Sequence, residues 1–449
     1  MANTIENLSE TAKEAVESVI EEVDEAGKEV AKIFKKEAKV LGPGLITGVS
    51  DDDPSGVIMY TATGAQFGYK MSWLTLFTLP LMTAIQEMCA RIGMVTGKGL
   101  AGVTKKHYGK WMVYISVSLL VIANTINIGA DLGAMAAVAK LVFGGEFVLY
   151  ILFFTILTLF LEIFISYKVY SKYLKWLAFS LLSYFVTAFI VKHDISSLIH
   201  GISSPFFTFD KIVLMTVVGF LGTTISPYLF FWQAGEEVEE AIKEKKIIAF
   251  GWGLPRINWR QIKLMRKDVL TGMILSNLAA YFIIITAAAT LYPAGVTSIE
   301  TASDAASALK PLAGNFASIL FALGIIGTGL LGVPVLAGSA AYAVSETFGW
   351  KEGLYRKVTQ AHGFYGVITF ATLIGLGINF VGISPMKALY YAAIANGIAS
   401  PFLIFVILLI CNNKKIMGNK SNGIWSNIFG IFTLIFMSSA AIALFIFWG

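Results

Sequence analysis

The chain alternates between long apolar runs and short polar segments. Most runs are about 18 to 25 residues long, the length that an α-helix needs to cross a hydrocarbon core about 30 Å thick. Lipid offers no hydrogen-bond partner to a bare backbone, so each run should form a helix. We expect eleven membrane-spanning helices, at approximately 44–66, 71–95, 111–136, 146–167, 173–191, 209–235, 269–292, 314–347, 361–379, 385–411 and 424–447.

The composition also predicts an all-α polytopic membrane protein. Of the 449 residues, 56% are hydrophobic and only 14% are charged, whereas soluble domains carry about 25% charged residues. The two cysteines and four histidines lack the spacing of a disulfide framework or of a metal site. No nucleophile–base pair or cofactor motif is visible, so we expect neither an enzyme nor a resident cofactor.

Charges between the apolar runs predict the orientation, because cytoplasmic loops are enriched in Lys and Arg. With a cytoplasmic N-terminus, inward segments carry roughly four times as many cations as outward segments. We therefore expect a multi-pass cell-membrane protein, whose net charge of +5 reflects topology and not nucleic-acid binding. The charged N-terminus does not resemble a cleavable signal peptide.

Two polar segments fall on the predicted cytoplasmic side. Residues 1–40 include an amphipathic helix over about 9–40, beginning with a capping box from Thr11 to Glu14. We expect this helix to lie on the membrane surface or to attach loosely. The segment 236–268 opens acidic and turns basic, and we expect a solvated, charged loop there.

The first and sixth apolar runs are each interrupted near the middle. The interruptions are Ser50-Asp51-Asp52-Asp53-Pro54-Ser55-Gly56 and Gly222-Thr223-Thr224-Ile225-Ser226-Pro227. Five helices separate them, and an odd number of helices per repeat inverts the second repeat. Paired broken helices in an inverted repeat indicate a transporter site near the bilayer midplane. We expect a first five-helix repeat over 41–200, a second over 201–411, and a cytoplasmic loop with an eleventh helix over 412–449.

The carboxylates of the first interruption are costly in a membrane and therefore suggest a function. Asp53 precedes Pro54, so capping of the second half-helix is an alternative for this residue, but capping hardly explains three carboxylates. Broken helices expose free carbonyls and amides, so carbonyls and carboxylates together could form an oxygen-lined cation site. We expect Asp53 to bind the ion, with Ser50 and Asp52 beside it, while the roles of Asp51 and Asp52 stay open.

The sixth and tenth runs supply further candidate ligands. Thr223 would offer its carbonyl and Ser226 its hydroxyl, although a Ser-Pro kink stabilised by that hydroxyl is an alternative. Asn396 could be a ligand through its amide, or could hydrogen bond to another helix. Gly56 would line the same site.

Over about residues 40–447 the chain resembles the natural resistance-associated macrophage protein transporters of divalent metals, solute carrier family 11. The resemblance is carried by Leu41-Gly42-Pro43-Gly44, Asp53-Pro54-Ser55-Gly56 and Gly64-Ala65-Gln66-Phe67-Gly68-Tyr69, and by Thr223-Thr224-Ile225-Ser226-Pro227-Tyr228. It implies a LeuT-type fold with two inverted five-helix repeats, an eleventh helix and alternating access. It also implies a divalent metal ion as substrate and the lipid bilayer as surroundings. The oligomeric state is left open, a monomer included.

Departures from the family motif change the expected substrate. Its first-helix pattern is Asp-Pro-Gly-Asn, and its sixth-helix pattern is Ala-x-x-Met-Pro-His. Here Asp53 is kept, but Gly56 stands at the Asn position and Ser226 at the Met position. Without the soft thioether, oxygen donors remain, and Mg²⁺ prefers such surroundings while keeping several waters. This is similar to the Nramp-related magnesium transporter branch, so we expect transport of Mg²⁺ and also of Mn²⁺.

The proton-handling residues of typical family members are mostly replaced. Asp131 matches, but the other acidic and His positions hold groups that do not titrate near neutral pH, namely Tyr228, Ala134, Asn124 and Gln233. We therefore expect transport without obligatory proton coupling. The alternatives are a proton-coupled Mn²⁺/Fe²⁺ importer of the same family and a Na⁺-coupled organic-solute symporter on the same fold.

Overall fold

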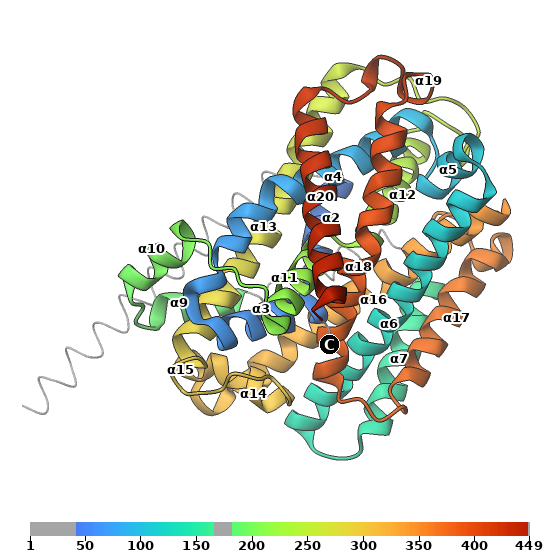
Figure 1. Cartoon of the computed structure of the whole chain (residues 1–449). Helices are drawn as coiled ribbons and strands as arrows, with labels where there is room; N and C mark the ends of the chain where they lie inside the picture. Colours follow the sequence, from blue (N-terminus) through green and yellow to red (C-terminus); the bar gives the residue numbers. More distant parts are fainter. Residues whose placement is uncertain (1–41, 166–181, 448–449) are drawn as a thin grey trace, which may run out of the picture. The chain divides into compact units, whose positions relative to one another are not determined.

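The structure, a computed structural model, describes residues 42–165 and 182–447. These residues form helices and the short segments that connect them (Figure 1). The predicted amphipathic helix within 1–40 lies outside the described residues, and so does the start of the fifth predicted run, over 173–181.

The long helices fall where the apolar runs predict them. They are α2 (Pro43–Asp51) with α3 (Pro54–Phe67), α4 (Trp73–Thr96), α6 (Lys110–Phe143), α7 (Phe147–Phe164), α9 (Leu182–Ile190), α11 (Lys211–Thr224) with α12 (Pro227–Lys243), α13 (Trp259–Thr290), α16 (Ala317–Phe348), α17 (His362–Ile378), α18 (Pro385–Asn412) and α20 (Ile424–Ile446).

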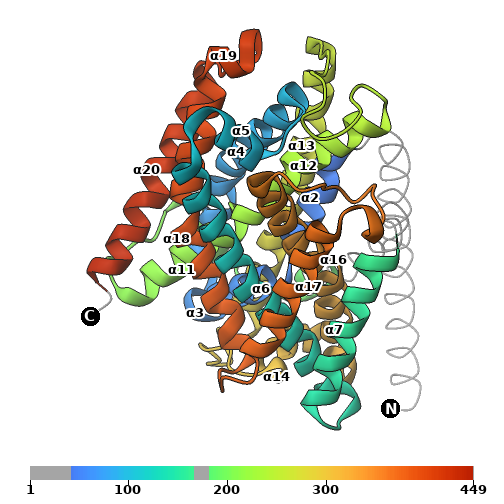
Figure 2. The ribbon, with the colours of Figure 1, turned by 90° about the vertical axis from the view of Figure 1, so that its right-hand side faces the viewer.

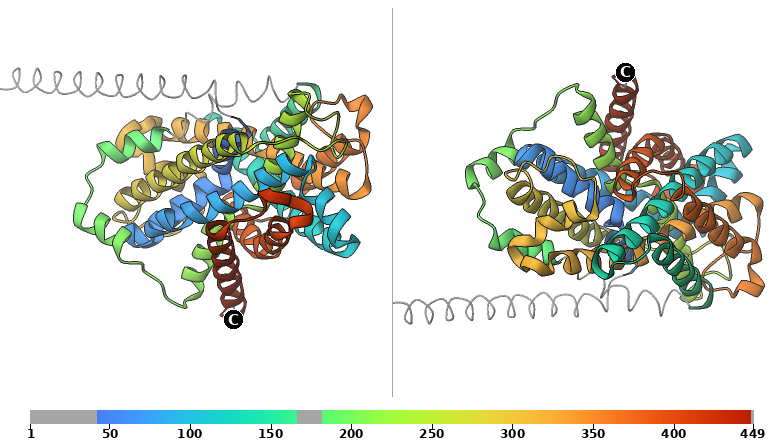
Figure 3. Two further views of the ribbon diagram at one scale, coloured as in Figure 1. Left: turned by 90° about the horizontal axis from the view of Figure 1, so that it is seen from above. Right: turned by 90° about the horizontal axis from the view of Figure 1, so that it is seen from below.

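Several short helices connect them that the apolar pattern does not predict. They are α5 (Leu100–Tyr108), α10 (Ile195–Ser203), α14 (Ala302–Ala306), α15 (Lys310–Ala313) and α19 (Lys414–Met417), with 3₁₀ turns at η1 (Gly68–Met71), η3 (Ser307–Leu309), η4 (Gly314–Phe316), η5 (Val358–Gln360) and η6 (Gly418–Lys420). Seen from above and from below, the green segment that includes α10 lies at the edge of the bundle (Figure 3).

Within the described residues, 7 helices are long and apolar enough to cross a membrane when α11 and α12 are counted together. The remaining predicted spans correspond to α2 with α3, α4, α9 and α17, which are shorter or less apolar. Such a set of apolar helices is typical of a multi-pass membrane protein.

Glycines allow two pairs of helices to approach closely at the centre of the bundle. A Cβ at Gly48 of α2 would collide with the backbone of Gly272 on α13, and a Cβ at Gly222 of α11 would collide with the backbone of α18 at Ala393 and Gly397. Small residues at such contacts are typical of membrane helix packing. Helix α6 runs beside α7, α16 and α17 (Figure 2).

The prediction of a solvated loop over 236–268 is partly wrong. Helix α12 continues to Lys243, and α13 already begins at Trp259. Glu236 and Glu237 are buried because α12 packs against α4 and α16 along this stretch. Only residues 244–258 connect the two helices.

Candidate metal-binding site

Each broken helix consists of two half-helices with a proline at the start of the second. Asp53 is the N-cap of α3, with Pro54 after it, and Ser226 is the N-cap of α12, with Pro227 after it. Proline suits this position because its missing N–H would have no intrahelical partner. The breaks leave the C-terminal carbonyls of α2 and α11 and the N-terminal amides of α3 and α12 outside a continuous helical ladder.

Asp53 is held by hydrogen bonds from its own helix, α3, and from the neighbouring helix α6. Its Oδ1 accepts hydrogen bonds from the Ser55 hydroxyl at 2.7 Å and from the Gly56 amide at 2.8 Å. Its Oδ2 accepts one from the Asn127 side chain of α6 at 2.7 Å. Asp53 therefore does cap α3, as the alternative interpretation suggested, but its second oxygen faces α6.

The three consecutive carboxylates separate into two groups. The Ser276 hydroxyl of α13 donates to Asp51 Oδ2 at 2.6 Å and to Asp52 Oδ1 at 3.4 Å, whereas Asp53 is turned towards α6. All three are buried, and Asp51 Oδ1 has no hydrogen-bond partner. In the described part of the chain, no three His, Cys, Asp or Glu side chains are grouped to hold a metal ion.

Gly56 and Thr223 bring the two breaks together. A Cβ at position 56 would lie 3.1 Å from Thr223 Oγ1 and 3.4 Å from the Asp51 carbonyl oxygen. Because Gly56 has no side chain, the break of the first helix packs directly against the break of the sixth helix at Thr223. Two of the predicted site residues, one from each repeat, are neighbours as expected.

The hydroxyls of Ser226 and Ser50 are engaged with their own helices. Ser226 Oγ donates to the carbonyls of Gly222 at 2.8 Å and Thr223 at 2.6 Å, the kink-stabilising arrangement given above as the alternative. Ser50 Oγ donates to Ile46 at 2.8 Å, and the Ser50 carbonyl accepts the Tyr228 hydroxyl at 3.0 Å. A carbonyl or hydroxyl oxygen keeps acceptor capacity after one hydrogen bond, so these groups stay candidates as ligands.

Asn396 is a buried amide on α18 with no hydrogen-bond partner for either side-chain atom. The alternative, a side-chain hydrogen bond to another helix, is therefore not made in this conformation. One turn further on, Ser400 donates to the carbonyls of Ile225 and Asn396, each at 2.8 Å. This contact joins α18 to the sixth-helix break.

Helix α6 brings to the site Asp131, which the sequence analysis named for proton handling, and Asn127, which it did not name. Asp131 is buried and neither of its oxygens has a hydrogen-bond partner. A Cβ at Gly332 of α16 would lie 3.0 Å from Asp53 Cβ and 3.6 Å from Asp131 Oδ2, so both carboxylates flank the same point. The signal for Asn127 was its spacing from Asn124 and Asp131, which places three polar groups on one face of an apolar helix. Ser276 of α13 carried no comparable signal.

Three of the positions where the resemblance would place titratable groups make hydrogen bonds in this structure. Asn124 donates to the Leu336 carbonyl and to the Ser339 hydroxyl, both at 2.8 Å, and Gln233 donates to Glu237 at 3.0 Å. Tyr228 donates to Ser50, as described above. Ala134 is buried.

A known protein family matches most of the length of this chain. The family model described as natural resistance-associated macrophage protein-like matches residues 44–447. The divalent metal cation transporter MntH of Chromohalobacter salexigens is 26% identical over 397 residues, covering 85% of each chain. The protein of the same name from Bacillus subtilis is 23% identical over 394 residues, covering 86% of each.

Solved structures have the same fold. The manganese transporter of Eremococcus coleocola, in complex with an aromatic bis-isothiourea substituted compound, aligns with a TM-score of 0.70 at 16% identity, covering 91% of this chain and 86% of that chain. Mhp1, a nucleobase-cation-symport-1 family transporter in a closed conformation, aligns with a TM-score of 0.54 at 14% identity, covering 90% and 92%. These likenesses confirm the all-α, LeuT-type fold with broken first and sixth helices.

Proposed function

Because the chain belongs to the natural resistance-associated macrophage protein family, we propose that it carries a divalent metal ion across the membrane by alternating access. Its curated relatives are named as divalent metal cation transporters. The observation that carries the proposal is the position of Asp53. This buried carboxylate lies at the first helix break and faces α6. Beside it lies a second carboxylate, Asp131, which has no hydrogen-bond partner. A divalent cation would compensate both charges.

The ligands that we propose are Asp53, the Thr223 carbonyl, the Ser226 hydroxyl and the Asn396 amide, with Gly56 lining the site and Asp52 and Ser50 beside it. Neither break supplies a thioether, so the donors are oxygens. Oxygen donors favour Mg²⁺, which binds with several of its waters. We therefore propose that Mg²⁺ is the principal substrate and Mn²⁺ a second one, as in the Nramp-related magnesium transporters that the motif resembles.

Transport without obligatory proton coupling is part of the same proposal. Asn124, Gln233 and Tyr228 make hydrogen bonds that need no proton exchange. We also propose a cytoplasmic N-terminus, inverted repeats over 41–200 and 201–411, and a cytoplasmic loop leading to the last helix over 412–449.

A second candidate is a proton-coupled importer of Mn²⁺ or Fe²⁺. It is favoured by the manganese transporter among the solved structures and by Asp131, which could still bind a proton. Competition between Mg²⁺ and Mn²⁺ in uptake by liposomes separates the two. The likeness to Mhp1 is one of fold alone and gives the organic-solute symporter no support from the site.

The test uses Asp53→Asn and Asp53→Ala in calorimetry of the purified protein with Mg²⁺, Mn²⁺ and Ca²⁺. Asn is a good N-cap, so Asp53→Asn keeps the cap of α3 and removes only the charge. We expect both variants to lose metal binding and uptake, with Asp53→Asn keeping the wild-type unfolding temperature. Asp210→Asn is the matched control, since Asp210 precedes α11 and its side chain makes no cap hydrogen bond. Near-normal Mg²⁺ binding by folded Asp53→Asn would refute the proposal.

A further inference from the structure

Glu162 is a buried carboxylate in one of the most apolar helices of the chain. It lies near the end of α7, whose apolar window has a mean hydropathy of 2.5. The residue is 8% exposed, and neither carboxylate oxygen has a hydrogen-bond partner. An ionisable residue in a membrane helix is costly to keep charged and is often functional. Nothing in the metal-site argument uses it.

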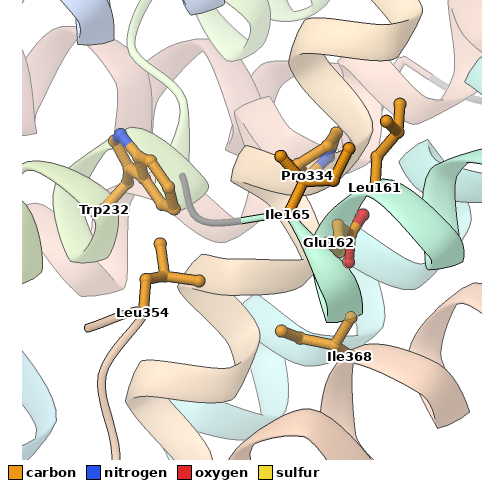
Figure 4. Close-up of a pocket in the computed structure, with 7 residues that line it drawn as sticks. All are labelled: Leu161, Glu162, Ile165, Trp232, Pro334, Leu354 and Ile368. Carbon is orange, nitrogen blue, oxygen red and sulfur yellow. The ribbon is translucent and has the colours of Figure 1, made fainter. Parts of the chain in front are cut away.

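The Glu162 side chain lines a small cavity (Figure 4). The cavity is lined by Leu161, Glu162, Ile165, Trp232, Pro334, Leu354 and Ile368, and has a volume of about 20 Å³. That volume holds about one water molecule. Glu162 is the sole titratable group in this lining, and a divalent ion, which needs about six oxygen ligands, would not be satisfied there.

Among the described residues, the surroundings of Glu162 supply a polar rim but no cation that pairs with it. Tyr365 of α17 interacts electrostatically with both Glu162 and Glu239 of α12, and its hydroxyl donates to the Arg356 carbonyl at 2.8 Å. His362 lies with Tyr365 along an adjoining surface groove between α7 and α17. From α16, Pro334 alone lines the cavity.

One wall of the cavity is attached to a broken helix. The Leu354 side chain lines the cavity, and the Leu354 amide donates to Glu239 Oε1 at 2.7 Å. Glu239 also accepts the Tyr342 hydroxyl of α16 at 2.8 Å. Trp232, another lining residue, belongs to α12 as well. Movement of α12 against α7 and α16 would therefore open the cavity.

We propose that Glu162 is a proton-binding site that is separate from the metal site and linked to the position of α12. A carboxyl group that has neither a cation nor a hydrogen-bond donor among the described residues holds its proton while Leu354 and Trp232 line the cavity. When Leu354 and Trp232 move away, water reaches the carboxyl group and the proton can leave. The proton regulates the balance between conformations and is not carried with the metal, so pH changes the rate of transport without driving it.

Infrared spectroscopy of the purified wild-type protein tests proton binding without any metal. Other buried carboxyl groups, Glu352 among them, also absorb in the carboxylic-acid region, so the readout is the difference spectrum at about pH 7. We expect wild type minus Glu162→Gln to show one carboxylic-acid carbonyl band, and wild type minus Glu146→Gln to show none. Glu146 is the matched control because it lies at the other end of the same helix, at its N-cap position. Leu354→Ala, which opens the wall, should speed the deuterium exchange of this band several-fold. Equal spectra for wild type and Glu162→Gln between about pH 5 and 8 would show an ionised Glu162 and overturn the proposal.

Uptake rates then test the link to conformation. Between about pH 6 and 8.5, at equal pH on both sides of the liposome, we expect the wild-type rate to change several-fold. Glu162→Gln should have a flat profile and Glu146→Gln the wild-type profile. Superimposable profiles for wild type and Glu162→Gln would overturn the link. A failure of the metal proposal would appear separately, in the Asp53 variants.

Discussion

The side chain of Asn127 on α6 donates a hydrogen bond of 2.7 Å to Asp53 at the break of the first helix. Both residues are buried. Asp53 Oδ1 accepts from the Gly56 amide and the Ser55 hydroxyl of its own helix, while the contact with Asn127 directs Oδ2 to α6. Asn127 therefore positions the carboxylate that we propose as the anchor of the metal ion.

Asn127→Ala should weaken metal binding without preventing folding. Partners that orient a ligand typically change metal affinity about 10- to 100-fold, and we expect a loss in this range by calorimetry. Asn124→Ala is the control, since Asn124 lies on the same helix but donates to α16. It should lower the unfolding free energy by about 1 kcal/mol and leave metal affinity unchanged. Equal affinities for wild type and Asn127→Ala would remove Asn127 from the site.

The combined variant Gly56→Asn with Ser226→Met should shift preference from Mg²⁺ to Mn²⁺. The thioether is a softer ligand, and the larger side chains take space from bound water. Loss of the Ser226 hydroxyl also frees the carbonyls of Gly222 and Thr223. We expect at least about a tenfold change in the affinity ratio, or 1.4 kcal/mol, in competition uptake.

Two single variants serve as controls for the combined variant. Ser226→Ala removes the hydroxyl without adding sulfur, so it should not raise the preference for Mn²⁺. A Cβ at position 56 lies only 3.1 Å from Thr223 Oγ1, so Gly56→Asn alone should show how much of the change comes from displacing Thr223. Unchanged Mg²⁺ transport by the double variant would contradict the hydrated-ion argument.

The helix breaks could be predicted from the sequence because their causes are local. Pro54 and Pro227 follow polar residues inside apolar runs, and the breaks occur at those prolines. The inverted repeat followed from the number of runs between them. The closeness of Gly56 and Thr223 could also be expected, since both breaks belong at the middle of the membrane.

The partners of the aspartates could not be predicted in the same way. Asn127 is 74 residues from Asp53, and Ser276 is 225 residues from Asp51. A single sequence does not reveal which helix faces are in contact, and one Ser or Asn in an apolar run is common. Burial of Glu236 and Glu237 was missed for the same reason, because charge alone suggested a solvated loop.

The stability of the protein should fall as pH rises through the range in which Glu352 titrates. This residue follows α16, is 8% exposed, and has one oxygen without a hydrogen-bond partner. Burial, followed by the charges of Glu346 and Glu239, raises the pKa of Glu352 to about 10. The folded state therefore binds a proton that the unfolded chain releases above a pKa of about 4.3, and the unfolding free energy should decrease by up to about 1.4 kcal/mol per pH unit between these values.

Glu352→Gln should remove this contribution. Thermal unfolding in detergent, followed from about pH 6 to 9, should show the variant gaining on the wild type as pH rises. Glu300→Gln serves as control, because Glu300 is exposed and pairs with Lys387 at 3.3 Å. Parallel curves for wild type and Glu352→Gln would contradict the expected titration.

Metal uptake into liposomes should not acidify the lumen, and an imposed pH gradient should not drive it. Coupling needs a relay whose protonation changes in each cycle. Asn124, Gln233 and Tyr228 are instead held in hydrogen bonds. Asp131 could bind a proton, but with Asn124, Gln233 and Tyr228 at the other positions of the former relay, too few titratable groups remain there to complete a path. The proton proposed at Glu162 would change the rate of uptake and would not be transported.

Uptake should depend on membrane potential, since two positive charges cross without compensation, at about 2.3 kcal/mol per charge per 100 mV. The measurement is a pH-sensitive dye inside the liposomes at a fixed potential, with Mg²⁺ or Mn²⁺ added outside. The wild type and Asp53→Ala should give equally flat dye signals, although only the wild type takes up metal. Acidification that requires both metal and Asp53 would show that a proton accompanies the ion, and would favour the proton-coupled Mn²⁺/Fe²⁺ importer.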